Sequence, residues 1–422
     1  MKFIYLYVFI EIICISGAVN AAELTYVDLP QQAQVEAALA SHLNVQNATT
    51  GIKIGQINQR KWSSGNYEFN LRAGTSQRKI TSTGQDYKEY DFAIERPLRL
   101  PNKMLLDGDI GDEGVNHAEQ VLGDAYHETG RTLLHLWFNW QREYAQLNQW
   151  QQQVEILQQQ AATAEKRFKA GDAPKMELNQ AQAAVSQSLV SLQQAKMRMH
   201  SAATELTRQF PSFVFPSAPA VSLPQPVTQD LAYWKKQIIG HNHELEMALS
   251  EKRIQQMLAQ RGRADRVPDP TVGLRYSNEM GGDEKVTGLY ISVPLSFGLR
   301  GANAQQAEYQ AELSGNREAN VRRRLDADIN AAYSQAVESY QTWQQAREAA
   351  ENLRKNAELV TRAYTLGESS LSETLTARRF ALETTLAESI AQLDANETRY
   401  RLMLDAHELW SMTTHLEHSP KQ

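Results

Sequence analysis

The sequence predicts a mainly α-helical protein with a small β part. Three observations support this class: a long coiled-coil pattern that occurs twice, four short segments of alternating polarity, and an apolar N-terminal segment. We expect two long helical hairpins and four strands in each chain. Three chains would form an α-helical barrel of long coiled-coil hairpins that continues into a twelve-stranded transmembrane β-barrel.

The N-terminal residues 1–21 have the pattern of a signal peptide. Lys2 precedes the apolar stretch 3–15, and small residues up to Ala21 suit cleavage there. The only cysteine, Cys14, lies in this segment, so we expect no disulfide bond in the remaining chain. At the other end, residues 413–422 are expected to form a flexible tail.

Residues 22–226 are expected to form the first of two structural repeats, and residues 227–412 the second. Five prolines between 211 and 226 exclude a helix there and make this stretch a linker. The first repeat is predicted to contain a helix over about 31–58, strands at 67–73 and 90–95 around a polar loop at 75–86, a long helix over about 105–170 and a return helix over about 174–210. The second is predicted to contain a helix over about 229–260, strands at 271–276 and 288–295, a long helix over about 302–366 and a return helix over about 370–410.

The two long helices share one apolar pattern. In residues 137–168 and again in 333–364, ten apolar positions recur at spacings of three and four, which is the period of a coiled coil. Each position of the first set is matched 196 residues later, and the match continues through Gly171 and Gly367. This correspondence indicates an internal duplication. At about 1.5 Å per residue, each long helix would measure roughly 100 Å.

Four strands cannot close a barrel, and an open sheet leaves two hydrogen-bonding edges exposed. Strands with apolar and polar sides fit a transmembrane β-barrel, in which other copies of the chain pair the free edges. In the fourth strand, we expect Leu289, Ile291 and Val293 to face lipid and Tyr290 and Ser292 to face the lumen. The alternatives are a soluble pair of β-hairpins for the strands and an ordinary antiparallel bundle for the helices.

The turns between long and return helices contain residues typical of helix ends. Gly171 and Gly367 suit the ends of the long helices. Pro174 suits the first position of the first return helix, and Ser370 suits the N-cap of the second. Glutamates follow both residues at a distance of three, which for Ser370 is the spacing of a capping box. Capping is therefore one interpretation of these glutamates.

Several motifs together resemble one known family. They are Arg167-Phe168-Lys169-Ala170-Gly171 with Glu177-Leu178, the second copy Tyr364-Thr365-Leu366-Gly367 with Ser370 and Glu373, Arg96-Pro97-Leu98 with Pro101, Pro268-Asp269-Pro270, and Val293-Pro294-Leu295. Over residues 30–412 the sequence resembles TolC-like outer membrane efflux proteins. The segments 96–103 and 268–273 lean towards the heavy-metal-cation, CzcC-like branch.

The resemblance implies a passive exit duct of a tripartite efflux pump, set in the outer membrane with its helical tube in the periplasm. The implied partners are two further copies of the chain, outer membrane lipid, a periplasmic adaptor protein and an inner-membrane pump of the resistance-nodulation-division type. The implied substrates are metal cations or drugs. A periplasmic adaptor with a single hairpin, and a coiled-coil scaffold without lipid-facing strands, are the alternative classes.

In the family, the turn between long and return helix binds the adaptor and carries a constriction that must open. The resemblance therefore implies adaptor-binding tips at Gly171, Pro174, Gly367 and Ser370, and a pore gate formed by Tyr364, Glu373 and Glu177. A ring of three Glu373 side chains would favour cations. Ser369 and Thr376 occupy positions where related exporters often carry an arginine and an aspartate, so the gate here is expected to be held differently.

No residue pattern indicates an enzyme, a cofactor or a metal site. His241, His243 and Glu244 lie close together but lack the spacing of metal ligands on a helix, and His415 and His418 fall in the predicted tail. The formal net charge of −6 gives no reason to expect a nucleic-acid partner.

Overall fold

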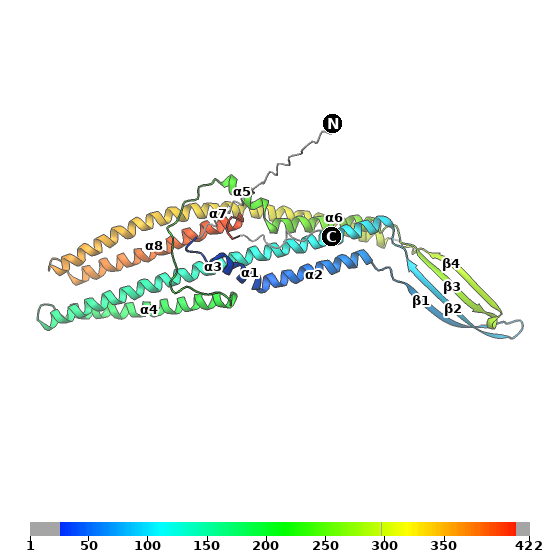
Figure 1. Cartoon of the computed structure of the whole chain (residues 1–422), viewed down its shortest axis with the longest axis horizontal. Coiled ribbons are helices and arrows are strands. Elements are labelled where there is room, and N and C mark those ends of the chain that lie inside the picture. Colours follow the sequence, from blue (N-terminus) through cyan, green and yellow to red (C-terminus); the bar gives the residue numbers. More distant parts are fainter. Residues whose placement is uncertain (1–25, 297, 411–422) are drawn as a thin grey trace, which may run out of the picture.

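The computed structural model describes residues 26–296 and 298–410. The molecule is elongated, with helices along a rod and a sheet at one end (Figure 1). The predicted class, mainly α-helical with a small β part, is confirmed. The predicted signal peptide, 1–21, and the predicted tail, 413–422, lie outside the described residues.

The same order of elements occurs twice along the chain. The first half contains α1 (Gln32–Ser41), α2 (Leu43–Ser64), β1 (Asn70–Lys79), β2 (Asp86–Pro97), α3 (Pro101–Lys169) and α4 (Lys175–Gln209). The second half contains α5 (Leu231–Gly240), α6 (His243–Ala264), β3 (Thr271–Glu279), a short 3-10 turn at Met280–Gly282, β4 (Glu284–Ser292), α7 (Leu299–Thr365) and α8 (Leu371–Asp405). The repeat limits at 226 and 412 stay predictions.

The prediction of one continuous helix is wrong at two places, where the structure has two shorter helices instead. The helix predicted over 31–58 is interrupted at His42, whose backbone is extended and whose Nδ1 accepts a hydrogen bond of 3.2 Å from the amide of Asn44. The helix predicted over 229–260 is interrupted before α6, where the Oδ1 of Asn242 accepts a hydrogen bond of 2.8 Å from the amide of Leu245. Each break leaves the apolar pattern almost unchanged, so periodicity alone does not detect it.

The polar loop predicted at 75–86 is also wrong, because most of it is strand. β1 continues to Lys79, which pairs with Asp86 at the start of β2. This part of the sheet is polar on both sides, so it lacks the alternation that identifies a half-buried strand. The fourth strand likewise begins earlier than predicted, at Glu284, and ends at Ser292.

The four strands form one antiparallel sheet in the order β1-β2-β3-β4. On one face, Leu71, Ile94, Leu274 and Leu289 form a row across all four strands. These side chains remain 78%, 43%, 45% and 81% exposed in the single chain. An apolar sheet face without cover within the chain needs an apolar environment outside it.

The opposite face of the sheet is polar and internally paired. The hydroxyl of Tyr290 donates a hydrogen bond of 2.5 Å to Glu95. The guanidinium of Arg78 lies 2.6 Å from Glu89 and 2.6 Å from Glu279, so it joins β1, β2 and β3. The two faces therefore have opposite chemistry, as in a strand with one lipid side and one water side.

The order in which the helices lie side by side differs between the two ends of the rod. Near the sheet the order of contacts is α2-α3-α6-α7, and near the tips it is α4-α3-α8-α7. The largest core cluster lies at mid-rod, where Trp137 and Phe138 of α3, Trp234 of α5 and Tyr400 of α8 are buried together.

A buried charge cluster joins the sheet to the rod. Lys103, at the start of α3, is fully buried, and its Nζ lies 2.9 Å from Asp269 and 3.1 Å from Asp265. Beside it, Arg261 at the end of α6 lies 2.6 Å from Asp107 of α3. These pairs link the two hairpin bases and hold the sheet on the ends of the helices.

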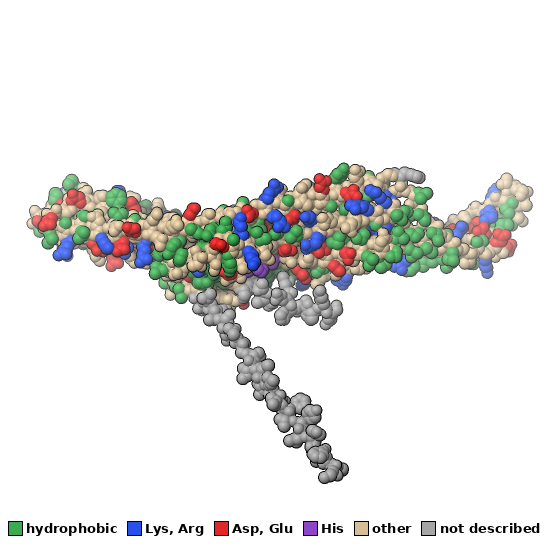
Figure 2. Space-filling model, turned by 90° about the horizontal axis from the view of Figure 1, so that it is seen from above, with side chains coloured by type: hydrophobic (Ala, Val, Ile, Leu, Met, Phe, Trp, Pro, Cys, Tyr) green, Lys and Arg blue, Asp and Glu red, His purple; other side chains and the backbone are tan. Residues whose placement is uncertain are grey.

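Hydrophobic side chains also gather where the rod meets the sheet (Figure 2). The exposed large apolar residues of the segments that meet there are Leu98, Met104, Leu105, Val267, Leu295 and Leu299.

Candidate gate and docking tips

Each long helix ends in the same type of turn at the tip of its hairpin. Gly171 and Gly367 have φ values of +78° and +82°. Their amides donate to the carbonyl oxygens of Phe168 and Tyr364 at 3.0 and 3.1 Å, which is the pattern of a Schellman motif. A Cβ atom at either glycine would meet nothing within 4 Å. The left-handed backbone, and not the surrounding space, is therefore what requires glycine here.

The second return helix begins with a reciprocal capping box. The Oγ of Ser370 accepts a hydrogen bond of 3.2 Å from the amide of Glu373, and the carboxylate of Glu373 accepts one of 2.8 Å from the amide of Ser370. The carboxylate also accepts a hydrogen bond from the hydroxyl of Ser369. The hydrogen bond from the Ser370 amide, followed by the one from Ser369, lowers the pKa of Glu373. Glu373 is thus an exposed, anionic capping residue.

The first return helix begins differently from the expectation. Pro174 was expected at the first helical position, N1, of α4. In the structure it is the N-cap, and Lys175 is the first helical residue. Glu177 does not cap this helix, because it points to the second hairpin instead.

Two of the predicted gate residues, Tyr364 and Glu177, meet at the tip. The hydroxyl of Tyr364 donates to the carboxylate of Glu177 at 3.4 Å. Arg167 completes the group: its guanidinium donates a hydrogen bond of 2.8 Å to the Tyr364 hydroxyl and lies 3.6 Å from Glu177. Burial raises the pKa of Tyr364, which keeps the phenol protonated. Glu373, the third predicted gate residue, is not part of this group.

These three residues, named here the tip link, join the two hairpins, because Arg167 and Glu177 belong to the first and Tyr364 to the second. Beneath the link, the fully buried Leu371 of α8 packs in one cluster with Ala164 of α3 and Ala181 of α4. The tip is therefore held by one polar group and one apolar contact.

Sequence reasoning identified Arg167 only as part of a motif and not as a functional residue. The signal that marks it is a difference between the two repeats. At the offset of the duplication, Arg167 corresponds to Ala363, and Tyr364 corresponds to Phe168. The shortest contact of the link therefore joins a guanidinium and a hydroxyl that each occur in only one of the two copies.

A groove of about 870 Å³ lies between the hairpins above the tip link. Glutamines of α3 such as Gln152 and Gln159 line one wall, and Arg354 of α7 and Arg378 of α8 line the other. Arg378 donates a hydrogen bond of 3.1 Å to the hydroxyl of Thr361, and burial lowers its pKa. This wall of the groove therefore carries positive charge.

Within residues 26–296 and 298–410, no group of three or more histidine, cysteine or carboxylate side chains is placed to hold a metal ion. In the same part of the chain, no helix contains a stretch that is long and apolar enough to cross a membrane.

The solved structures that this chain resembles include outer membrane channels. The chain matches the outer membrane channel CmeC of Campylobacter jejuni with a TM-score of 0.76 and 15% identity, over 90% of this chain and 86% of that one. It matches the outer membrane protein VceC of Vibrio cholerae with a TM-score of 0.72 and 15% identity, over 90% and 96%. It matches CusC with a TM-score of 0.69 and 15% identity, over 89% and 91%. The fold is thus that of a protomer from a channel with a helical barrel and a β-barrel.

Residues 64–209 match the family model "Outer membrane efflux protein". The search of curated protein sequences gave no match. The family match thus runs from the end of α2 to the end of α4, and the likeness in fold extends over 90% of the chain.

Proposed function

We propose that three copies of the chain form the outer membrane exit duct of a tripartite efflux pump. The sheets close a β-barrel in the outer membrane, and the rods form a tube in the periplasm. An adaptor protein binds at the tips and connects the duct to an inner-membrane pump of the resistance-nodulation-division type.

The observation that carries this proposal is the sheet. Its apolar face is exposed in the single chain, its opposite face is polar, and β1 and β4 have free edges. Free edges inside a bilayer leave backbone groups without partners, so the sheet is stable there only when another copy pairs each edge. The apolar residues at the base of the sheet would lie at the level of the inner lipid headgroups.

The free edges of the molecule suggest a head-to-tail ring. In the sheet they are β1 and β4, near the sheet they are α2 and α7, and near the tips they are α4 and α7. At each level one free edge thus comes from the first half and the other from the second half. When such unlike edges meet, the contact is heterologous and closes a ring at a suitable rotation. Three chains give twelve strands, an even number within the usual range.

The outer face of α4 supports this contact. Met176, Ala183, Val190 and Met197 recur at steps of seven and are exposed. A heptad seam of apolar residues is the surface that a partner helix covers in a coiled coil. Leu359 on α7 and Leu366 at its C-cap are also seven residues apart, and each is 67% exposed. We expect these two helices of neighbouring copies to pack together.

The tips supply the docking and gating parts. Gly171, Pro174, Gly367 and Ser370 are all exposed, which suits a surface for an adaptor hairpin. Tyr364 and Glu177, with Arg167, hold the two hairpins together in the closed state. Glu373 keeps its negative charge at the same end of the tube and would form a ring of three in the trimer. Metal cations remain the proposed cargo for the CzcC-like branch, and drugs are the alternative.

The experiment is fractionation followed by electrical recording. The protein, produced with its N-terminal segment in a Gram-negative host, should sediment with the outer membrane and run as a trimer that separates on heating. The purified trimer should form discrete pores in planar bilayers. Recovery in the soluble periplasmic fraction, or membrane insertion without any conductance, would contradict the proposed duct.

A further inference from the structure

Four histidines converge at mid-rod, where the end of α8 meets α3 and the α5–α6 break. The ring of His407 lies 5.3 Å from that of His127, 5.6 Å from that of His241 and 5.4 Å from that of His243, measured between centroids. The four come from three places in the chain: α3, the α5–α6 break, and the residues after α8. We refer to them as the histidine cluster.

His407 has an unusual backbone for its position. Its φ is +59°, and its amide donates to the carbonyl oxygen of Leu404 at 3.0 Å. The next amide, that of Glu408, donates to Met403 at 2.8 Å, so His407 stands where glycine ends the other two hairpin helices. Two and three residues further on, Leu409 and Trp410 are buried in the main core. His407 therefore holds the end of α8 and the following residues on the rod.

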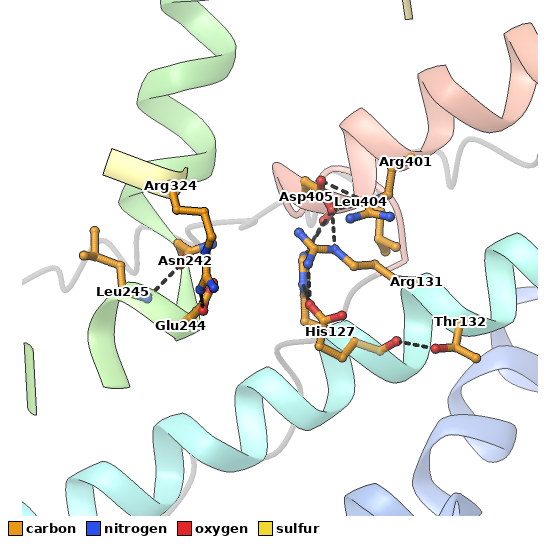
Figure 3. A network of polar contacts seen from close by, with 11 residues as sticks. His127, Arg131, Thr132, Asn242, Glu244, Leu245, Arg324, Arg401, Leu404 and Asp405 are labelled. Carbon is orange, nitrogen blue, oxygen red and sulfur yellow. Dashed lines mark hydrogen bonds and ion pairs between the residues drawn. The ribbon is translucent and has the colours of Figure 1, made fainter. Parts of the chain in front are cut away.

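Charged groups face the cluster from every element packed against it. Arg131 of α3 and Arg401 of α8 both bind the carboxylate of Asp405, at 2.8 and 3.0 Å, beside His127 (Figure 3). The other charged groups that line the same cavity are Asp124 and Glu128 of α3, Glu244 of α6 and Asp328 of α7. Glu128 is paired with Arg131, and Glu244 with Arg324. Most of the negative charge is thus already matched by arginines.

His407 is only weakly compensated, because Asp405 raises its pKa by less than burial and the neighbouring histidines lower it. Among the described residues, no hydrogen bond holds its imidazole, and its neighbours are three other imidazoles. Burial, together with the charges that His127, His243 and His241 would carry, lowers the pKa of His407 from 6.5 to about 4. Burial also lowers the pKa of His243. Burial raises the pKa of Asp124, which removes negative charge from the cavity as the solution is acidified.

We propose that the histidine cluster makes the junction of α8 with α3 and the α5–α6 break a proton-sensitive joint, which is closed while His407 and His243 are neutral and loosens when they take up protons. The cavity of about 290 Å³ beside the cluster gives protons access to it. When the joint loosens, the end of the second hairpin is released from the middle of the rod. This inference concerns the chain itself and holds whether or not the proposed duct is correct.

The direction of the pH effect on the stability of the closed joint follows from the linkage between proton binding and opening. The pKa of His407 is lower in the closed state, so protonation favours the open state. The closed state is therefore fully stable only above the ordinary histidine pKa of 6.5, and it loses stability as the pH falls from there towards 4. With a pKa of 6.5 in the open state and about 4 in the closed state, the equilibrium constant for opening should rise on the order of 30-fold between pH 7.5 and pH 5. A joint without titrating groups would show no such rise.

The experiment is hydrogen–deuterium exchange on the purified full-length protein, expressed as protection factors so that the pH dependence of the chemical exchange rate is removed. Peptides covering residues 400–410 and 238–246 should lose protection on the order of 30-fold from pH 7.5 to pH 5. His407→Asn removes the titrating ring and keeps a residue that accepts a left-handed backbone, so it should reduce this loss to a few-fold. His200→Gln, a change of an exposed histidine on α4, should behave as the unmodified protein.

His241→Gln serves as a second variant, because His241 is exposed and its loss is compatible with folding. It removes one of the charges that oppose protonation of His407, so the loss of protection between pH 7.5 and pH 5 should become smaller. Protection that does not change with pH in the unmodified protein would overturn the proposal. An unchanged pH response in both His407→Asn and His241→Gln would overturn it as well.

Discussion

The guanidinium of Arg167 donates a hydrogen bond of 2.8 Å to the hydroxyl of Tyr364 and lies 5.3 Å from the centroid of its ring. These residues lie at the tips of different hairpins, so the contact ties the two halves of the duplicated chain at the end remote from the sheet (Figure 1). The two hairpin tips can separate only if this contact breaks; otherwise they must move together. We therefore expect the stability of the tip to depend on it.

Removing the Tyr364 hydroxyl tests the tip link. Tyr364→Phe keeps the ring over Arg167 but removes the hydrogen bonds to Arg167 and Glu177, at a cost of about 1 kcal/mol. The closed duct should open more often, so the open probability in planar bilayers should rise severalfold while the trimer remains intact. Tyr309→Phe, a change of an exposed tyrosine near the other end of α7, is the matched control. Equal open probabilities for the two variants would show that the link does not restrain the gate.

A substitution at Glu373 can separate its role in capping α8 from the effect of its negative charge. Glutamine also serves at the third position of a capping box, so Glu373→Gln should preserve the start of α8 and remove the negative charge. The cation preference, measured from reversal potentials in a salt gradient, should decrease. Ser370→Ala should instead destabilise the start of α8 by about 0.5–2 kcal/mol.

Glu36→Gln, on α1 at mid-rod, is the control for a surface charge remote from the tips. If Glu373→Gln leaves ion selectivity at the level of this control, Glu373 only caps its helix.

The two faces of β4 give a paired test of the barrel. Ile291 lies on the apolar face, where it pairs with Val272, and Ser292 lies on the opposite face. Ile291→Arg should cost roughly 2–4 kcal/mol per chain near the middle of the bilayer, whereas Ser292→Arg should cost much less. The measurement is the denaturant midpoint for unfolding from lipid vesicles. Equal losses for both variants would mean that the assignment of the faces, or the barrel itself, is wrong.

The glycine turns test the docking of the adaptor. Gly367 has a left-handed backbone and open space around its Cα, so Gly367→Val strains the turn by about 1–3 kcal/mol without a clash. Efflux should be lost while trimer formation and membrane insertion persist, because the sheet lies at the other end of the rod. Gly315→Val changes a glycine within α7 that also has open space and a helical backbone, and it should retain efflux. Full resistance with Gly367→Val would show that this turn is not part of the docking surface.

The elements that the sequence predicts well are those with a strong period. The long helices and the four strands follow from apolar spacing, because each buries or exposes one continuous face. The breaks at His42 and Asn242 escape such reasoning, since a side-chain cap changes the direction of the backbone without changing the period. The polar half of the first hairpin escapes it too, because its strands are set by backbone pairing between residues such as Lys79 and Asp86.

The candidate site is predictable in part for a related reason. Glycine at a left-handed turn and the box of Ser370 and Glu373 are local features, and the sequence contains all the information they need. The meeting of Tyr364 with Arg167 and Glu177 depends on how two hairpins pack side by side, as does the convergence of His407 with three histidines from other elements. Neighbours in the sequence do not encode such contacts.

In the proposed duct, three copies of the chain close a ring through unlike edges, and cross-linking between two of these edges tests this arrangement. Ile57 on α2 and Leu313 on α7 are exposed, 45% and 48%, on the two edges of the rod near the sheet. The contacts Gln59–Gly111, Glu113–Arg253 and Lys252–Glu318 place them at similar height. With Cys14 replaced or cleaved off, the double variant Ile57→Cys and Leu313→Cys carries only these two thiols.

A short thiol cross-linker applied to intact membranes should convert the double variant into covalent trimers, with dimers as intermediates, and each single variant should stay monomeric. Covalent species that stop at the dimer, or that continue beyond the trimer as a ladder, would contradict a closed ring of three chains.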